Sequence, residues 1–307
     1  MAASEDHDVV IVGAGVAGVS CALECFDIRL DTVLLEQDAR PGGQLTEIPH
    51  AVRNIATSRH TSGAELRESL ENTANILGPR LRLSQRVVRV NVAQRWVETD
   101  DTRVRGRALV LATGTRHQYL PAAVDGAFGG DVTYLLEARP EHFAGRAVAV
   151  IGGGDSATLD ALELADSGSD VKLIHRSEHL TARHDIVDAM RRQPAIEELA
   201  GWELDSVSGG DRLEAVVIRT HDGTTRRLAV GGLVVKIARL PRTELFAGQL
   251  DLDRAGAIVV DRELRTSCDG VFAAGDVVAG AYARVATALG QGSLAARSVL
   301  RHLQHTS

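Results

Sequence analysis

Apolar runs alternate with stretches of helical periodicity along this chain. Near the N-terminus, the apolar run Val9–Val12 is followed by the helical pattern of residues 16–27 and then by the run Thr32–Glu36. Short apolar runs without polar alternation are typical of strands that are buried on both faces of a parallel sheet. The pattern therefore predicts a strand–helix–strand unit in this part of the chain.

The same order of elements returns near the middle of the chain. The run Ala147–Ile151 precedes a helical pattern that begins at Ser156, and Val171–His175 follows as a second apolar run. Alternation of buried strands with helices indicates parallel strands joined by helical crossovers. The sequence thus predicts an α/β protein that contains two units of one kind.

Gly13-Ala14-Gly15-Val16-Ala17-Gly18 joins the first strand to its helix. In such a loop the first glycine allows the tight turn, the second lets the backbone approach a diphosphate, and the third lets the helix pack close to the strand. The helix N-terminus favours the negative charge of the phosphates. Glu36 ends the next strand, where a carboxylate binds ribose hydroxyls. With strand, helix and acid in place, we predict a dinucleotide site.

Gly152-Gly153-Gly154-Asp155-Ser156-Ala157 is the corresponding loop of the second unit. The strand that follows ends in His175-Arg176 rather than in an acid, and Arg183 lies nearby. A cation at this position suits the 2′-phosphate of NADPH, so NADPH is favoured over NADH. The alternative is that Arg176 is only a solvated surface charge.

Two more strands, Leu109–Thr115 and Gly270–Asp276, end in a glycine next to a polar residue, and a helix from Arg284 to His302 closes the chain. We interpret Gly275-Asp276 as the closing part of a flavin site, in which the carboxylate accepts a hydrogen bond from a ribityl hydroxyl. The N-terminus of the last helix then faces the flavin. A plain turn with a helix cap is the alternative.

Together these motifs resemble thioredoxin reductases and the thioredoxin-reductase-like ferredoxin (flavodoxin)–NADP reductases. The resemblance covers nearly the whole chain in the right order. The matching runs are Gly13–Gly18, Pro41–Leu45, Ala112–Gly114, Gly152–Ala157, His175-Arg176, Gly270–Asp276 and Arg284–Gly292.

The resemblance implies an α/β fold with two Rossmann-like dinucleotide-binding domains. A discontinuous FAD domain comprises residues 1–117 and 245–307, and an inserted NAD(P)H domain comprises residues 118–244. The resemblance also implies a homodimer and a swivelling NADPH domain. From the residues themselves, the crossings between the domains are expected near residues 115–120 and 242–248, where Pro121 and Pro241 punctuate the sequence.

Carried over position by position, the motifs also imply cofactor contacts. The residues expected at the FAD are Gly13, Gly15, Gly18, Glu36, Gly42, Gln44, Leu45, Asn54, Val87, Thr113, Gly114, Gly275, Asp276, Val285 and Ala286. The residues expected at the NADPH are Gly152, Gly154, Asp155, Ser156, His175, Arg176 and Arg183. The second arginine of the family's phosphate clamp is Ser177 here, which predicts a looser clamp.

The chain departs from thioredoxin reductases at the redox-active Cys-x-x-Cys pair. Counted back from the second glycine loop, that slot holds Leu135-Leu136-Glu137-Ala138. Thiol–disulfide exchange needs a thiolate, so the sequence excludes ordinary thioredoxin reduction by this chain alone. The ferredoxin-reductase branch is closer, but its aromatic C-terminal extension over the flavin is missing from the tail Leu303–Ser307.

Cys21, Cys25 and Cys268 are the cysteines of the chain. None belongs to a Cys-x-x-Cys pair, and Cys21 and Cys25 share one face of the predicted helix. We interpret these two as small core residues, with a redox pair as the alternative.

Length and charge narrow the function classes further. A chain of 307 residues suggests two domains, and a net charge of −7 without a long basic run argues against nucleic acid as a main partner. The acidic N-terminus and the lack of a long apolar run predict neither a signal peptide nor a membrane segment. The expected location is the cytoplasm.

The leading hypothesis is an FAD-dependent oxidoreductase that passes hydride from NADPH to FAD and then electrons to a non-disulfide acceptor. That acceptor is a ferredoxin- or flavodoxin-like protein or a small molecule, and hydride transfer needs no protein acid or base. One alternative is a flavin-dependent oxidase of a small molecule, with His50, His60, His117 or His142 as acid–base groups. A non-catalytic flavin-binding regulator is the other. We assign no catalytic residue and expect no metal.

Overall fold

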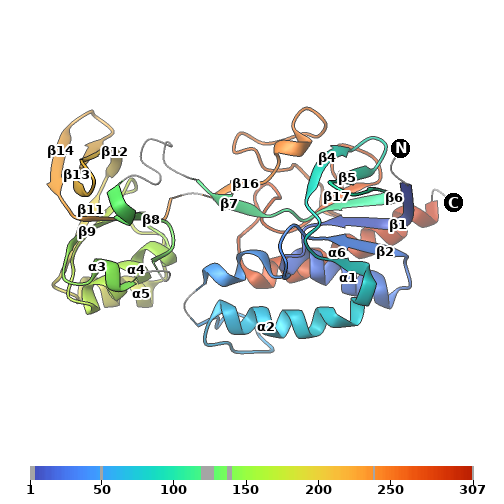
Figure 1. Ribbon diagram of the computed structural model, residues 1–307, viewed down its shortest axis with the longest axis horizontal. Coiled ribbons are helices and arrows are strands. Elements are labelled where there is room, and N and C mark those ends of the chain that lie inside the picture. The colour runs from blue at the N-terminus through green and yellow to red at the C-terminus, as the bar shows by residue number, and fades with distance from the viewer. Residues whose placement is uncertain (1–3, 49–50, 119–127, 137–139, 238, 306–307) are drawn as a thin grey trace. The chain divides into compact units, whose positions relative to one another are not determined.

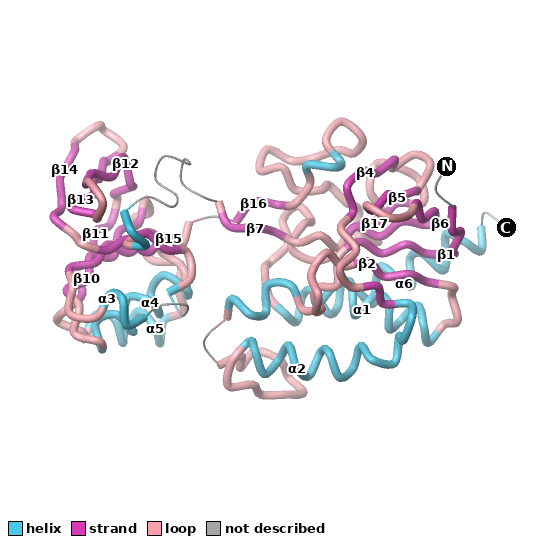
Figure 2. Tube along the Cα trace, viewed as in Figure 1, coloured by secondary structure: helices cyan, strands magenta, loops and turns pink. Residues whose placement is uncertain are grey.

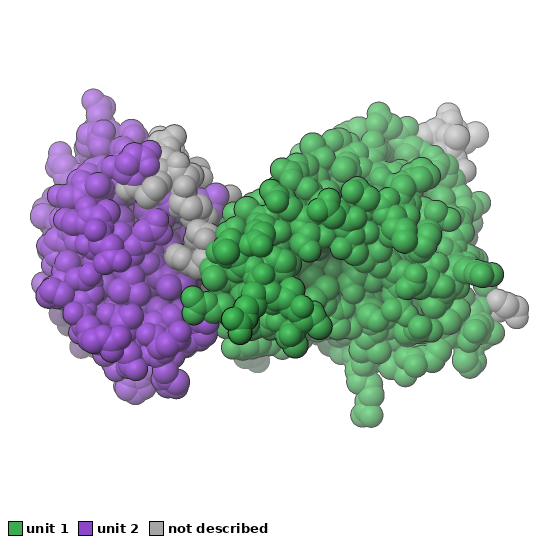
Figure 3. Space-filling model, turned by 90° about the horizontal axis from the view of Figure 1, so that it is seen from below, with its two compact units in different colours: residues 1–116, 240–307 green, residues 117–239 purple. Residues whose placement is uncertain are grey.

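The structure is a computed structural model that describes residues 4–48, 51–118, 128–136, 140–237 and 239–305 (Figure 1). The chain forms two compact units (Figure 3). Unit 1 comprises Met1–Arg116 and Leu240–Ser307, and unit 2 comprises His117–Arg239. In the sequence, unit 2 is therefore inserted between the two segments of unit 1.

The second crossing between the units differs from the expected position. Residues 240–244, expected in the inserted domain, lie with unit 1 because side chains and backbone hold them there. The Arg242 amide donates to the Gly114 carbonyl (3.0 Å), and the Thr113 hydroxyl donates to the Arg242 carbonyl (2.8 Å). The resemblance and the positions of the prolines do not reveal such pairing between distant segments.

The strands of unit 1 form a seven-stranded sheet of order β3-β2-β1-β6-β5-β4, with β17 also paired to β6. Strands β1, β2, β3, β6 and β17 are parallel to their neighbours in this series, and β4, β5 and β6 pair antiparallel. The strands are β1 (Ser4–Val12), β2 (Thr32–Leu35), β3 (Leu81–Arg82), β4 (Val87–Asn91), β5 (Trp96–Thr99), β6 (Arg103–Leu111) and β17 (Val271–Ala273).

Helices cover one face of this sheet (Figure 1). Along β1, Val9 and Ile11 pack with the helices, whereas Val10 and Val12 pack on the opposite face with residues such as Phe246. This alternation follows from the two-residue period of a strand. The helices are α1 (Val16–Asp27), α2 (Gly63–Ala74) and α6 (Val285–His305), with 3₁₀ turns η1 (Gly43–Glu47), η2 (Asn75–Arg80) and η5 (Glu244–Phe246).

Unit 2 contains a parallel five-stranded sheet of order β11-β10-β9-β15-β8. Helices lie against one face, and an antiparallel sheet of β12, β13 and β14 lies on the other (Figure 2). The strands are β8 (Val132–Thr133), β9 (Ala147–Ile151), β10 (Asp170–His175), β11 (Ile196–Ala200), β12 (Trp202–Gly209), β13 (Leu213–Thr220), β14 (Thr225–Ala229) and β15 (Gly232–Val235). The helices are α3 (Pro140–Phe143), α4 (Asp155–Asp166) and α5 (His184–Arg191), with the 3₁₀ turn η3 (Phe128–Gly130). A two-stranded sheet of β7 (Thr115–His117) and β16 (Arg239–Pro241) lies where the chain passes between the units.

A buried carboxylate ties the two sheets of unit 2 together. Asp131 is 0% exposed and accepts hydrogen bonds from Arg146 (2.9 Å), Arg212 (2.7 Å) and His142 (2.9 Å). Burial raises the pKa of Asp131, but the backbone amide of Leu213 and these side chains outweigh burial and lower the pKa to about 2. The carboxylate is therefore ionised and stabilises the junction between β8 and β13.

The structure confirms the predicted strand–helix–strand units and their repetition. Helix α1 and strand β9 have the predicted bounds, whereas β1 begins earlier than the apolar run because residues 4–8 pair with the first half of β6. Helix α6 continues past the predicted end at His302 to His305. Among the described residues, none of the helices combines the length and the hydropathy required to span a bilayer.

Candidate functional site

The first candidate site lies at the carboxyl edge of the sheet in unit 1. Strands β1, β2, β6 and β17 run parallel, so the residues that follow them meet at one edge. Backbone hydrogen bonds fix this edge: the amide of Gly13 donates to Leu35 (2.8 Å), and that of Ala112 donates to Val12 (2.9 Å). The predicted motifs Gly13–Gly18, Thr113-Gly114 and Gly275-Asp276 are thereby brought together.

Two glycines of the first loop are required by the protein itself. Gly13 has φ = 101°, and a Cβ at this position would lie 2.5 Å from the Ala112 carbonyl oxygen. A Cβ on Gly18 would overlap the Gly13 carbonyl oxygen. The first glycine therefore makes the turn, and the other allows α1 to approach the strand.

Gly15 is different because no contact among the described residues requires a glycine there. Its backbone is extended (φ = −68°, ψ = −175°), and a Cβ would meet no atom of the described segments within 4 Å. Gly15 is the N-cap of α1 and has no side-chain cap, so the amides of the first helical turn lack a capping acceptor. Open space in front of these amides fits the diphosphate of a dinucleotide.

Glu36 holds the glycine turn in place. The carboxylate is 7% exposed, and Oε2 accepts a hydrogen bond from the Ala14 amide (2.7 Å) while Oε1 accepts one from the Asp38 amide (3.0 Å). Each carboxylate oxygen has a second lone pair, so Glu36 keeps the capacity to accept from ribose hydroxyls. The side chain thus both shapes the loop and remains suited to its predicted role.

Several other residues predicted at the FAD lie close to this edge. The Gly42 amide donates to the Ala14 carbonyl (2.8 Å), and the Gly275 amide donates to Gln291 Oε1 (2.7 Å). The Gln44 side chain lies against Gly114, 3.1 Å from the position of a Cβ on that glycine. The segment before β4 runs beside the end of β2, with the Gln85 amide bonded to the Glu36 carbonyl (2.7 Å), which places Val87 nearby.

The remaining predicted residues are less well defined by their contacts. Leu45 is buried in an apolar cluster against which Val285 packs. Asp276 is half-buried, whereas Asn54 and Ala286 are exposed. The FAD contacts of all these residues stay predictions.

The second candidate site lies at the carboxyl edge of the parallel sheet in unit 2. Gly152 has φ = 141°, and a Cβ there would overlap the Lys236 carbonyl oxygen, so the turn requires a glycine. Gly154 is the N-cap of α4 without a side-chain cap, and the nearest atom to its Cβ position is Thr181 Oγ1 at 3.9 Å. This space also fits a diphosphate, with Ser156 exposed in the first turn of α4.

Two of the basic residues near this loop already have carboxylate partners. Arg183 pairs with Asp155, since its amide donates to Oδ1 (2.8 Å) and its Nε lies 3.4 Å from Oδ2. His175 is buried against Gly153, and its Nε2 lies 3.2 Å from Glu198 Oε1. Arg183 is therefore already in an ion pair with Asp155, and its contact with the nucleotide stays a prediction.

Arg176 is the basic residue best placed to meet an additional phosphate. It is exposed at the end of β10, and within the described ranges it has no ion-pair partner. An exposed guanidinium without a carboxylate partner suits bidentate binding of a phosphate.

Sequence reasoning missed two carboxylates and a lysine at this second site. Glu198 faces His175 from β11, and Lys236, directly after β15, forms a buried ion pair with Asp160 of α4 (3.1 Å). Both pairings join positions far apart in the chain. An aspartate within a helical pattern and a lysine after an apolar run give no local indication that they meet.

Cys21 and Cys25 behave as core residues, as the sequence interpretation predicted, whereas Cys268 is half-buried. Cys21 and Cys25 are fully buried and unbridged. A hydrogen bond with Cys25 and burial raise the pKa of the Cys21 thiol well above its ordinary value. A thiol in this environment is a poor nucleophile, which disfavours a redox pair on α1.

The proposed acid–base histidines have structural partners. His60 Nε2 lies 3.1 Å from the Ser58 hydroxyl, His117 Nε2 lies 3.3 Å from Arg239 Nη1, and His142 binds Asp131. His50 lies outside the described residues. The same holds for Glu137 and Ala138, in the slot of the family's cysteine pair, and for Pro121, near the expected domain crossing. The structure therefore gives no support to a particular histidine as a catalytic group.

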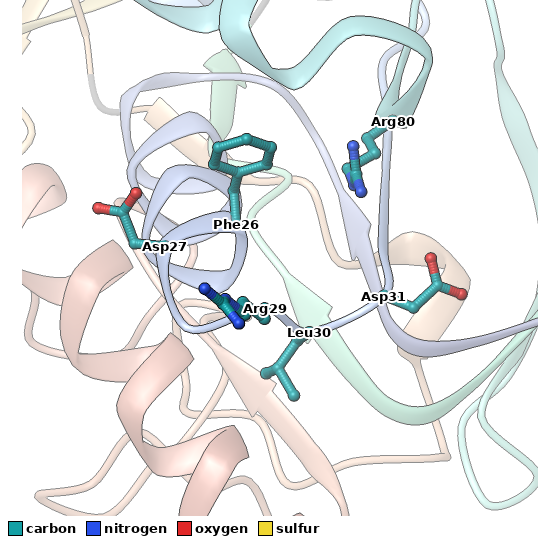
Figure 4. A pocket seen from close by; sticks show the side chains of 6 residues that line it. All are labelled: Phe26, Asp27, Arg29, Leu30, Asp31 and Arg80. Atoms are coloured by element: carbon teal, nitrogen blue, oxygen red, sulfur yellow. The ribbon is translucent and has the colours of Figure 1, made fainter.

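A surface hollow of about 450 Å³ lies elsewhere in unit 1 (Figure 4). Its lining includes Phe26, Leu30 and Arg80, at the C-terminal end of α1. Because the glycine turn is at the N-terminal end of the same helix, the hollow is separate from the dinucleotide edge.

Comparison with known proteins agrees with this geometry. Residues 7–292 match the pyridine nucleotide-disulphide oxidoreductase family. The chain is 32% identical to a thioredoxin reductase of Streptomyces clavuligerus over 98% of this chain and 95% of that protein. It is 28% identical to a 34.2 kDa protein in the rubredoxin operon of Clostridium pasteurianum, over 94% of each chain.

A solved structure shows the same architecture. The thioredoxin reductase of T. acidophilum superimposes with a TM-score of 0.84 at 27% identity, covering 99% of this chain and 100% of the other. The chain therefore belongs to the pyridine nucleotide-disulphide oxidoreductase family, as an FAD-dependent oxidoreductase of the thioredoxin reductase type that uses FAD and NADPH.

Proposed function

We propose that this protein takes reducing equivalents from NADPH through FAD to an acceptor that is not a disulfide. Unit 1 (residues 1–116 and 240–307) is the FAD domain, and unit 2 (residues 117–239) is the NADPH domain. The cofactors supply the redox chemistry, in which nicotinamide donates hydride and the flavin accepts it. The protein binds and orients both groups.

The observation that carries this proposal is the pair of open glycine N-caps. Gly15 and Gly154 each cap a helix without a side chain, and in the part of the chain that the structure describes neither has a close neighbour at its Cβ position. Each belongs to a turn whose first glycine is required by a positive φ. One diphosphate in each unit explains why both caps stay open.

NADPH rather than NADH follows from the charges at the end of β10. Arg176 is exposed and unpaired in the described part of the chain, so it is available to a 2′-phosphate. Glu198 is held between His175 and Arg191 (3.2 and 3.7 Å). These pairs reduce the repulsion that the carboxylate exerts on a phosphate.

The non-disulfide acceptor follows from the cysteines. The sequence contains no Cys-x-x-Cys pair, and the thiols of Cys21 and Cys25 are buried in the core. Without an accessible dithiol, the chain has no group of its own to relay electrons to thioredoxin. The acceptor is then a ferredoxin- or flavodoxin-like protein or a small molecule that meets the flavin directly.

Anaerobic stopped-flow reduction of the FAD-loaded protein tests this function. We expect NADPH to bleach the flavin absorbance faster than NADH does, without any further substrate. The reduced protein is then mixed with thioredoxin, ferredoxin, flavodoxin and quinones. Reoxidation by thioredoxin would contradict the non-disulfide acceptor, and slow reduction by both nucleotides would contradict the whole route.

Two other outcomes would point to the alternatives. Bleaching only by a metabolite would indicate a flavin-dependent oxidase, and binding of both cofactors without turnover would indicate a regulatory protein. The expected homodimer stays a prediction, which light scattering of the FAD-loaded protein tests.

A further inference from the structure

A buried ion pair lies behind the glycine turn of unit 2. Lys236 Nζ lies 3.1 Å from Asp160 Oδ2, and the two side chains are only 8% and 2% exposed. Lys236 is the first residue after β15, and Asp160 belongs to α4. The pair therefore connects the end of a strand to the helix that carries the open N-cap.

Stability alone does not account for this pair. Removing two charges from water is unfavourable, and a well-packed apolar pair is often equally stable at such a position. Breaking one partner is far more damaging than replacing both, because a lone buried charge is left behind. A buried ion pair at a site edge is better explained by the geometry that it imposes.

That geometry concerns the turn Gly152–Gly154. The Lys236 amide donates to the Ile151 carbonyl (2.7 Å), and the Lys236 carbonyl oxygen fills the space where a Cβ on Gly152 would lie. Lys236, which directly follows β15, thus packs against the turn.

The other partner holds the helix side of the turn. Asp160 lies five residues into α4 from Asp155, which is about 7.5 Å along the helix axis. Two residues before Asp160 in α4, the Thr158 hydroxyl donates to the Gly154 carbonyl (3.1 Å). The ion pair thus joins the end of β15 to α4, and the turn Gly152–Gly154 is held between them.

We propose that the Lys236–Asp160 ion pair positions the second glycine turn for binding the nicotinamide nucleotide. The pair sets the separation between the end of β15 and α4, so the amides at the start of α4 keep the orientation that the diphosphate needs. Both are positioning residues and are not expected to touch the ligand. This inference rests on the proposed NADPH site at Gly154.

The test measures binding and local dynamics of the FAD-loaded protein rather than turnover. NADP⁺ is titrated into the wild type, Lys236→Met, Lys236→Arg and Asp160→Asn, and amide hydrogen exchange is followed over residues 151–158. We expect Lys236→Met and Asp160→Asn to weaken NADP⁺ binding about tenfold or more and to speed exchange in the turn. Lys236→Arg, which keeps the charge, should restore most of the affinity, and FAD content should stay unchanged.

Asp131→Asn is the matched control, because it disrupts another buried ionic cluster of unit 2 that involves Arg146 and Arg212. It should lower thermal stability without changing NADP⁺ affinity. Wild-type affinity in Lys236→Met and Asp160→Asn would overturn the inference, as would an affinity loss in the control equal to theirs. Failure of the wild type itself to bind NADP⁺ would instead refute the proposed function, and this inference with it.

Discussion

Gly15→Ala is the most direct test of the FAD site, because the structure separates its effect on folding from its effect on binding. The Gly15 backbone (φ = −68°, ψ = −175°) is allowed for alanine, and among the described residues no atom lies within 4 Å of the new Cβ. Alanine is a poorer N-cap than glycine, but it also reduces the freedom of the unfolded chain, which is worth about 0.4–1 kcal/mol in the opposite direction. The free energy of unfolding of the apoprotein should therefore change by less than about 1 kcal/mol.

Binding of FAD should respond much more strongly. The added methyl group would project from the N-cap of α1, where the proposed diphosphate approaches the backbone, and should hinder that approach. Hydrogen bonds to a charged group contribute about 1.5–3 kcal/mol each. Loss of one such bond corresponds to a drop in FAD affinity of about 10- to 100-fold.

The assay is titration of apoprotein with FAD, followed by flavin fluorescence, together with thermal unfolding of the apoprotein. Gly210→Ala is the control, because a Cβ at this turn position in unit 2 also meets no atom within 4 Å. Control and wild type should bind FAD equally. Wild-type affinity in Gly15→Ala would show that the open cap does not hold the diphosphate, and the assignment of unit 1 would fail.

Three further substitutions test single side chains. In Glu36→Gln only one side-chain oxygen is left to accept, so the NH₂ group faces the backbone amide of either Ala14 or Asp38. FAD occupancy, measured by absorbance, should therefore fall. Full occupancy would refute the role of the carboxylate. Arg176→Ala should weaken NADPH binding about tenfold and leave NADH nearly unchanged, and an equal loss for both in paired titrations would refute the phosphate assignment. Asp131→Asn should lower the free energy of unfolding at pH 7 by about 2 kcal/mol, because the pKa of this carboxyl falls from 3.8 to about 2 on folding. This stabilisation is present above pH 3.8 and is lost as the pH falls through about 2. The free energies of unfolding of the variant and the wild type, measured with denaturant, should therefore converge in acid. A difference that stays constant with pH would contradict this coupling of protonation to folding.

The sequence by itself determined the repeated strand–helix–strand units and the positions of both glycine turns. These features depend on residues close together in the chain: an apolar run, a glycine that takes a positive φ, and a helix that starts directly afterwards. For Gly13 and Gly152 the local pattern was sufficient, because the turn conformation excludes a side chain at both positions.

Only the tertiary structure decided which charges remain available around those turns. Arg183 and Arg176 look alike in the sequence, yet one pairs with Asp155 and the other is left exposed without an ion-pair partner in the described part of the chain. The partnership of Lys236 with Asp160 arises because β15 lies beside β9 and α4 follows β9. Ion pairs of this kind depend on the order of strands in the sheet, which juxtaposes distant segments, and no local pattern of residues encodes that order.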